Sequence, residues 1–155
     1  SGVYIATLDY ELNEGDTTVT ITATDEAGNV STPLEQIVTV DTIAGTISID
    51  VPLEGDDLVN GAEATDVIVS GTTTGIEAGQ IVTVVLSDGA ATPNTVTLEA
   101  TVQADGTWAL SGDQVANIAT WENGNISVTA NVNDVANNVA EQATHTLVLD
   151  TIAGA

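Results

Sequence analysis

Apolar and polar residues alternate one by one over long stretches of this chain. The pattern is clearest at residues 18–24, 95–102 and 126–133, where Val, Ile, Leu or Ala occupies every second position and Thr, Ser, Asn or Glu lies between. Successive side chains of a β-strand point to opposite faces of the sheet, so this period of two predicts strands with one buried and one solvated face. No segment shows the 3.6-residue period of an amphipathic helix.

The same pattern predicts seven strands between residues 46 and 149. They span residues 46–51, 67–72, 80–87, 95–103, 106–111, 125–133 and 141–149. Gly, Asn, Asp and Pro, which favour turns, fill the intervals between them. This spacing predicts an all-β fold, an immunoglobulin-like, seven-stranded antiparallel β-sandwich, with Trp108 and Leu110 facing its core from the fifth strand.

The chain contains an internal repeat. The pentapeptide Asp-Thr-Ile-Ala-Gly occurs at residues 41–45 and again at 150–154, 109 residues later. Residues before the two copies match at this offset: Val19, Ala23, Asp25, Ala27, Asn29 and Val38 correspond to Val128, Val132, Asp134, Ala136, Asn138 and Leu147. Self-similarity at a fixed spacing is typical of tandem arrays. We therefore predict that residues 1–41 end one repeat, residues 42–150 form a complete repeat, and residues 151–155 begin the next linker.

The first 41 residues supply only part of such a sandwich. We predict strands at residues 2–8, 17–24 and 34–40, with Tyr4 in the place of Trp108 when the repeats are aligned. Three strands of a sandwich cannot bury both faces of their sheets alone. Three alternatives stay open: the segment is poorly ordered, a longer chain contains the missing strands, or a neighbouring chain supplies them.

The charge of the chain is almost entirely negative. Its 155 residues include 23 Asp and Glu, one His and no Lys or Arg, for a formal net charge of −23. Without a basic surface, nucleic acid is excluded as a partner and anionic membranes are disfavoured. No apolar run is long enough for membrane insertion, and Cys is absent. The hydrophobic fraction of 43% predicts a folded chain despite the charge.

The topology of the predicted sandwich gathers carboxylates at the end where the chain enters the repeat. The loops after the second, fourth and sixth strands would lie there, and they carry Glu77, Asp105 and Asp134. The linker that reaches this end carries Asp41. Clustered carboxylates repel one another unless a cation binds them, and oxygen ligands of this kind suit Ca²⁺. We therefore predict a Ca²⁺ site at this junction.

A second Ca²⁺ site is predicted at the opposite end of the repeat. Asp57 and Glu63 lie on one long loop there, and Asp150 leaves the repeat toward the next one. Asp25 of the partial repeat corresponds to Asp134 and is a further candidate metal ligand. The alternative for each of these acids is a solvated turn residue, which is the usual role of an isolated loop Asp.

Three segments resemble the bacterial immunoglobulin-like repeats of giant adhesins that are exported by type I secretion and often end in calcium-binding (RTX) nonapeptides. They are Ala-Thr-Asp-Glu-Ala-Gly-Asn at 23–29, Val-Asp-Thr-Ile-Ala-Gly at 40–45 and Asp-Asp-Leu-Val-Asn-Gly-Ala-Glu-Ala at 56–64. The resemblance implies secreted, cell-surface extender repeats that contact neighbouring repeats of the same chain and are stiffened by Ca²⁺ at and near their junctions. Linkers in this family often end in Pro, whereas this one ends in Gly45, from which we expect a free hinge without metal.

No catalytic constellation stands out, and we expect that the chain is not an enzyme. His145 is the single histidine, its counterpart in the first copy is Gln36, and no nucleophile is marked beside it. Carboxylate pairs of the glycosidase type are plentiful, but the loops are nearly free of aromatic residues. Two alternatives to an extender are kept: a module that binds a glycan or protein, and a filament subunit completed by neighbouring chains.

Overall fold

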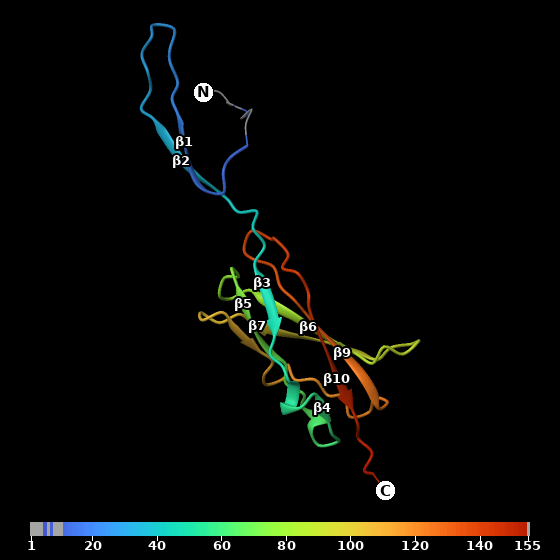
Figure 1. Cartoon of the computed structure of the whole chain (residues 1–155). Coiled ribbons are helices and arrows are strands. Elements are labelled where there is room, and N and C mark those ends of the chain that lie inside the picture. Colours follow the sequence, from blue (N-terminus) through green and yellow to red (C-terminus); the bar gives the residue numbers. More distant parts are fainter. Residues whose placement is uncertain (1–4, 6, 8–10, 155) are drawn as a thin grey trace. The chain divides into compact units, whose positions relative to one another are not determined.

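The structure is a computed structural model that describes residues 5, 7 and 11–154 (Figure 1). The chain forms two compact units that divide between Thr42 and Ile43. The predicted strand at residues 2–8, including Tyr4, falls outside the described residues apart from residues 5 and 7.

The larger unit confirms the all-β prediction. Its strands are β3 (Thr46–Ile49), β4 (Leu58–Val59), β5 (Ser70–Thr74), β6 (Ile81–Ser87), β7 (Thr95–Thr101), β8 (Thr107–Ala109), β9 (Gly124–Asn131) and β10 (Ala143–Leu149). Two single turns of 3₁₀-helix, η1 (Leu53–Gly55) and η2 (Glu63–Thr65), are the helical elements among the described residues. Each of the seven predicted strands therefore has a counterpart.

These strands form the two layers of a β-sandwich. One sheet has five strands in the order β4-β10-β9-β6-β7, and the other has three in the order β3-β5-β8. Alternate residues point into the space between the sheets: on β6, for example, Val82, Val84 and Leu86 are fully buried. Trp108 is also buried, as predicted, and a Cβ atom on Gly71 of the neighbouring strand would lie 2.6 Å from its Cζ2 atom. Gly71 therefore makes room for the indole ring.

The sequence analysis missed β4, which pairs in parallel with β10 and so departs from the predicted all-antiparallel arrangement. Pro and Gly residues at 52–61 predicted a turn, but the loop folds back along the last strand. Leu53, Val59 and Ala64 are buried as a result and close that end of the core. The predicted second strand also begins later, at Ser70, because Val67 forms only an isolated bridge with Ala116.

Within its described residues, the smaller unit contains one antiparallel hairpin, β1 (Gly15–Ile21) and β2 (Leu34–Val40). Its pairing register is the same as that of the β9–β10 hairpin. All seven residue pairs correspond at the 109-residue offset; the pair of Gly15 with Val40, for example, corresponds to the pair of Gly124 with Leu149. The isolated bridge beyond each hairpin also matches, between residues 24 and 30 in one unit and between 133 and 139 in the other. The sequence repeat is thus a structural repeat.

Candidate junction site

Each unit contains a loop of the same kind, in which an aspartate accepts hydrogen bonds from the asparagine four residues later. In the β9–β10 loop, the backbone amide and the side-chain amide of Asn138 donate to the two carboxylate oxygens of Asp134, both at 2.8 Å. In the β1–β2 loop, Asn29 donates to Asp25 in the same way at 2.8 and 2.9 Å. The side-chain amide of Asn29, followed by its backbone amide, lowers the pKa of Asp25. In each unit, these hydrogen bonds therefore fix the conformation of the loop that contains the aspartate.

Asp134 differs from Asp25 in its burial. It is 2% exposed and is the one charged residue that is buried among those the structure describes. An ionised carboxylate out of water needs hydrogen bonds or a compensating charge, and this chain contains no Lys or Arg. Asn138 supplies hydrogen bonds but no charge. Hydrogen bonds rather than a basic side chain therefore accommodate the burial of Asp134.

Glu77 and Asp105 reach the same end of the unit on two other loops. Oε2 of Glu77 accepts a hydrogen bond from the amide of Val135, next to Asp134, at 3.0 Å. The β7–β8 turn is joined to the β5–β6 loop by the amide of Gly79, which donates to the carbonyl of Val102 at 2.8 Å. The three loops that the topology argument placed together are thus connected by hydrogen bonds.

Asp134 and Asp105 are engaged within their own loops, whereas Glu77 accepts from the neighbouring loop. Oδ1 of Asp105 accepts from the amide and the hydroxyl of Thr107 at 3.0 and 2.7 Å, and the hydroxyl bond is the main cause of the lowered pKa of Asp105. Within the described ranges, no three Asp, Glu, His or Cys side chains are arranged as a group that would hold a metal ion. Asp41 belongs to the smaller unit. Its part in a shared site stays a prediction.

The threonine at the second position of each pentapeptide is anchored by hydrogen bonds. Thr151 donates from its amide and its hydroxyl to Oδ1 of Asn123, at 3.1 and 2.9 Å. Thr42 donates to the carboxylate of Glu14 in the same way, at 2.9 and 2.7 Å, and these bonds lower the pKa of Glu14. Oδ1 of Asp150 also accepts from the side chain of Asn123, at 3.0 Å. This anchor was not predicted from the sequence, although Glu14 and Thr42 correspond to Asn123 and Thr151 at the 109-residue offset.

Gly45 does not behave as the free hinge that we expected. A Cβ atom at this position would lie 2.6 Å from the carbonyl oxygen of Thr74 and 2.6 Å from Cδ1 of Ile76. The backbone at Gly45 is therefore packed against the loop after β5, where no side chain fits. Gly154, its equivalent in the second pentapeptide, has nothing within 4 Å of such an atom.

The predicted ligands at the opposite end are engaged separately. Oδ1 of Asp57 accepts from the amide of Leu53 at 2.7 Å and lies 2.8 Å from Nε2 of His145. The hydrogen bond with His145 is the main cause of the lowered pKa of Asp57. Oε2 of Glu63 instead accepts from the amide of Asn60, at 3.0 Å. A joint Ca²⁺ site of Asp57 and Glu63 stays a prediction.

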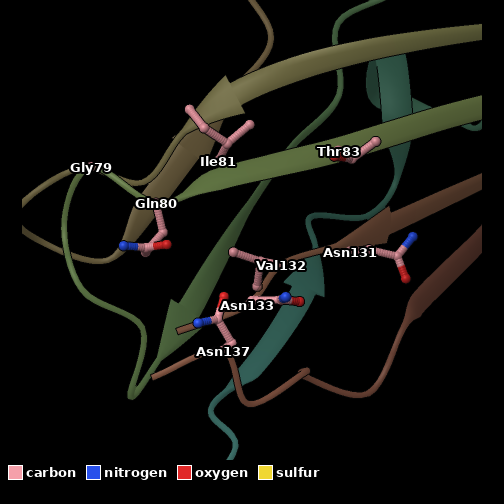
Figure 2. Close-up of a pocket in the computed structure, with 8 residues that line it drawn as sticks. All are labelled: Gly79, Gln80, Ile81, Thr83, Asn131, Val132, Asn133 and Asn137. Carbon is pink, nitrogen blue, oxygen red and sulfur yellow. The ribbon is translucent and has the colours of Figure 1, made fainter. Parts of the chain in front are cut away.

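An amide-lined pocket lies at the entry end, and the sequence analysis did not anticipate it. Gln80, Asn133 and Asn137 line one part of it, and Thr83 and Asn131 line another (Figure 2). Its volume is 340 Å³. The one sequence feature that pointed to this pocket is Asn137, which replaces a glycine of the first copy; in the structure it adopts a left-handed φ of 70°.

Comparison with solved structures places this geometry among adhesin repeats. The structure described as a tetra-tandem repeat in the extending region of a large adhesion protein has a TM-score of 0.61 and 28% identity, covering 90% of this chain and 32% of that one. A structure of a 1.5-MDa bacterial ice-binding adhesin has 29% identity and a TM-score of 0.47, covering 89% of this chain and 43% of that one. The D00-D0 domain of intimin has 17% identity and a TM-score of 0.38, over 89% of this chain and 66% of that one.

The present chain spans about a third of the tetra-tandem repeat structure. No family model and no curated protein matches it. Among the described residues, no helix has the length and apolar character needed to cross a membrane. The resemblance to immunoglobulin-like adhesin repeats that the sequence motifs predicted is confirmed by the likeness to the extending-region repeat.

Proposed function

We propose that this chain is a structural extender module of a large bacterial cell-surface adhesin, built from tandem immunoglobulin-like repeats that Ca²⁺ stiffens at and near their junctions. The observation that carries the proposal is the repetition of one hairpin, with its register and its linker anchor, in both units. Repeated units joined by identical linkers are typical of arrays that gain length by stacking. The similarity to an adhesin's extending region supports the same function.

The smaller unit fits this proposal as the last part of a preceding repeat. On the hairpin face that corresponds to the core of the larger unit, Ile21, Leu34 and Val38 are exposed. The equivalents of Ile21 and Val38, Ala130 and Leu147, are fully buried between the two sheets, and the equivalent of Leu34, Ala143, is partly buried against the core. An apolar face of this kind needs a second layer. The first part of the same repeat in a longer chain would supply it, and completion by a neighbouring chain is the alternative.

The donor chemistry at the entry end fits Ca²⁺. Carboxylate oxygens come from loops that are hydrogen-bonded together, and the net charge of −23 has no basic side chains to offset it. In this proposal Asp41, Glu77, Asp105 and Asp134 hold one ion. Asp57 with Glu63 would form a second site, and Asp25 and Asp150 would serve the equivalent junctions. Bound Ca²⁺ would supply the positive charge that the buried Asp134 lacks.

An extender of this kind acts outside the cell, so we propose a secreted, cell-surface location for the protein. Its role is mechanical, and no catalytic step is part of the proposal. Its partners are the neighbouring repeats of the same chain.

Thermal unfolding of the whole chain tests the Ca²⁺ component. We expect CaCl₂ to raise the unfolding free energy relative to EDTA at matched ionic strength, by about 2.7 kcal/mol at 100 times the dissociation constant. Asp134→Asn should lose most of this gain. In EDTA it removes a buried charge but also one of the two acceptors that Asn138 uses, so the diagnostic quantity is the calcium-dependent gain of each protein and not its stability in EDTA. Equal melting temperatures with and without calcium, or a gain that NaCl reproduces, would contradict Ca²⁺ binding.

Small-angle X-ray scattering of the whole chain tests the extender component. Calcium should narrow the distribution of distances between the two units, and Asp41→Asn should restore the broad distribution. Asp16→Asn is the matched control, because it removes one charge from an exposed position of β1. Identical profiles in CaCl₂ and EDTA, in a chain that calcium does stabilise, would mean that the ion strengthens the fold without stiffening the linker.

A further inference from the structure

The amide-lined pocket of Figure 2 lies where β6 begins and β9 ends. Thr83 and Asn131 are direct partners in the sheet, and Gln80, Asn133 and Asn137 extend the pocket beyond the ends of the two strands. Its volume of 340 Å³ lies within the range of small-molecule sites, which begins at about 300 Å³. The pocket is therefore large enough for a ligand the size of one sugar ring.

The side chains that line this pocket carry no charge, in a protein with a net charge of −23. Among the described residues, the side-chain amides of Gln80, Asn133 and Asn137 have no hydrogen-bond partner, while Oδ1 of Asn131 accepts from Gln142 at 3.0 Å. Each carboxamide offers two N–H donors and a carbonyl acceptor. The pocket thus presents several donors and acceptors that no protein group pairs with and that solvent or a ligand can reach.

The amides belong to this repeat and not to the scaffold that both units share. The equivalents of Asn131, Asn133 and Asn137 in the first copy are threonine, threonine and glycine, although the two loops make the same backbone hydrogen bonds. Asn137 adopts a φ of 70°, a conformation that glycine reaches without strain. The shared loop therefore needs no asparagine there, and Asn137, a residue type that tolerates this conformation, places an amide in the pocket.

These features define the class of ligand. A sugar ring carries hydroxyl groups that both donate and accept hydrogen bonds, as the carboxamides do. Ile81, which is apolar and exposed and also lines the pocket, can contact the C–H face of the sugar ring. An anionic ligand would be repelled by the net charge. A peptide that binds as an added strand needs a sheet edge, whereas β6 lies between β7 and β9, and β9 lies between β6 and β10.

We propose that this pocket is a binding site for one uncharged sugar ring, formed by Gln80, Thr83, Asn131, Asn133 and Asn137. The inference goes beyond the extender function, since it gives the repeat itself a weak affinity for neutral glycans. A ligand with so few atoms and no aromatic partner should bind with a dissociation constant of the order of 1–10 mM. Many copies of such a site along an array would raise the overall affinity of the array for a glycan that carries several sugar rings.

The test is an NMR titration of the ¹⁵N-labelled whole chain with methyl α-glucoside, methyl α-galactoside, methyl α-mannoside and N-acetylglucosamine. We expect at least one of these neutral sugars to shift the side-chain amide signals of Gln80, Asn133 and Asn137 in a saturable way. Glucuronate, the charged control, should bind at least tenfold more weakly. The absence of a saturable shift with every neutral sugar would overturn the proposal.

The first copy supplies the matched variant. Replacing Asn131 and Asn133 by Thr and Asn137 by Gly reproduces the residues of the other unit, so the loop should keep its fold while sugar affinity falls at least tenfold. Asn125→Thr removes an exposed asparagine of the same strand outside the pocket and should leave affinity unchanged. Unaltered binding by the triple variant, or pocket shifts caused by CaCl₂ and by none of the sugars, would overturn the assignment.

Discussion

Nε2 of His145 lies 2.8 Å from Oδ1 of Asp57, and this contact is the one ion pair found among the described residues. His145 is on the last strand, whereas Asp57 precedes the two-residue strand β4. The carbonyl oxygen of Asp57 also accepts from the amide of Val148, at 2.8 Å. The pair therefore attaches the loop that buries Leu53 to the strand that leads into the next linker.

Stability should depend on this pair at acidic pH. The hydrogen bond from His145, followed by the amide of Leu53, lowers the pKa of Asp57. A lowered folded-state pKa stabilises the fold above the unfolded value of about 3.9, and the contribution is lost as the pH falls through the lowered value. We expect Asp57→Asn to melt below the wild type at pH 6, with a difference that shrinks below about pH 4.

His145→Gln is the informative companion, because glutamine is the residue at this position of the first copy. It keeps a hydrogen-bond donor but lacks the imidazole ring, so its melting temperature should lie between those of the wild type and Asp57→Asn. A difference between the wild type and Asp57→Asn that stays constant from pH 6 to about pH 2 would show that the aspartate acts by packing rather than by its charge.

The linker anchor should control local opening of the pentapeptide. Asn123→Ala removes the acceptor of both hydrogen bonds from Thr151. Loss of about 1 kcal/mol of local stability would speed hydrogen exchange at the Thr151 amide about fivefold. Asn123→Glu installs the residue of the first copy and should preserve protection. Equal exchange rates in the alanine variant and the wild type would mean that the anchor does not limit opening.

The two pentapeptide glycines should respond differently to the same substitution. Gly45→Ala places a methyl group 2.6 Å from the Thr74 carbonyl oxygen and should destabilise the larger unit by about 1–3 kcal/mol. Gly154→Ala has open space and should change the unfolding free energy by less than about 1 kcal/mol. Chemical denaturation of both variants measures the difference. Equal effects would show that Gly45 is not held against the β5–β6 loop.

The sequence alone predicted the features that depend on neighbouring residues along the chain. Strand positions follow from the period of two, because each strand of a half-buried sheet alternates between core and solvent. The equal registers of the β1–β2 and β9–β10 hairpins follow from the 109-residue repeat, because matching side chains pair in matching ways. The burial of Trp108 has the same local origin, as have the turn hydrogen bonds of Asp25 and Asp134, which were kept as the alternative to the metal ligation predicted for them.

The tertiary structure decided what depends on segments that meet only after folding. Asp57 and His145 are 88 residues apart, and β4 has two residues, so neither the ion pair nor the parallel pairing leaves a periodic signal. Gly45 looked like a hinge because a glycine's own conformational freedom says nothing of the loop packed against it. The pocket likewise depends on β6 and β9, which are distant in sequence, because hydrogen bonds between strands rather than chain proximity bring its amides together.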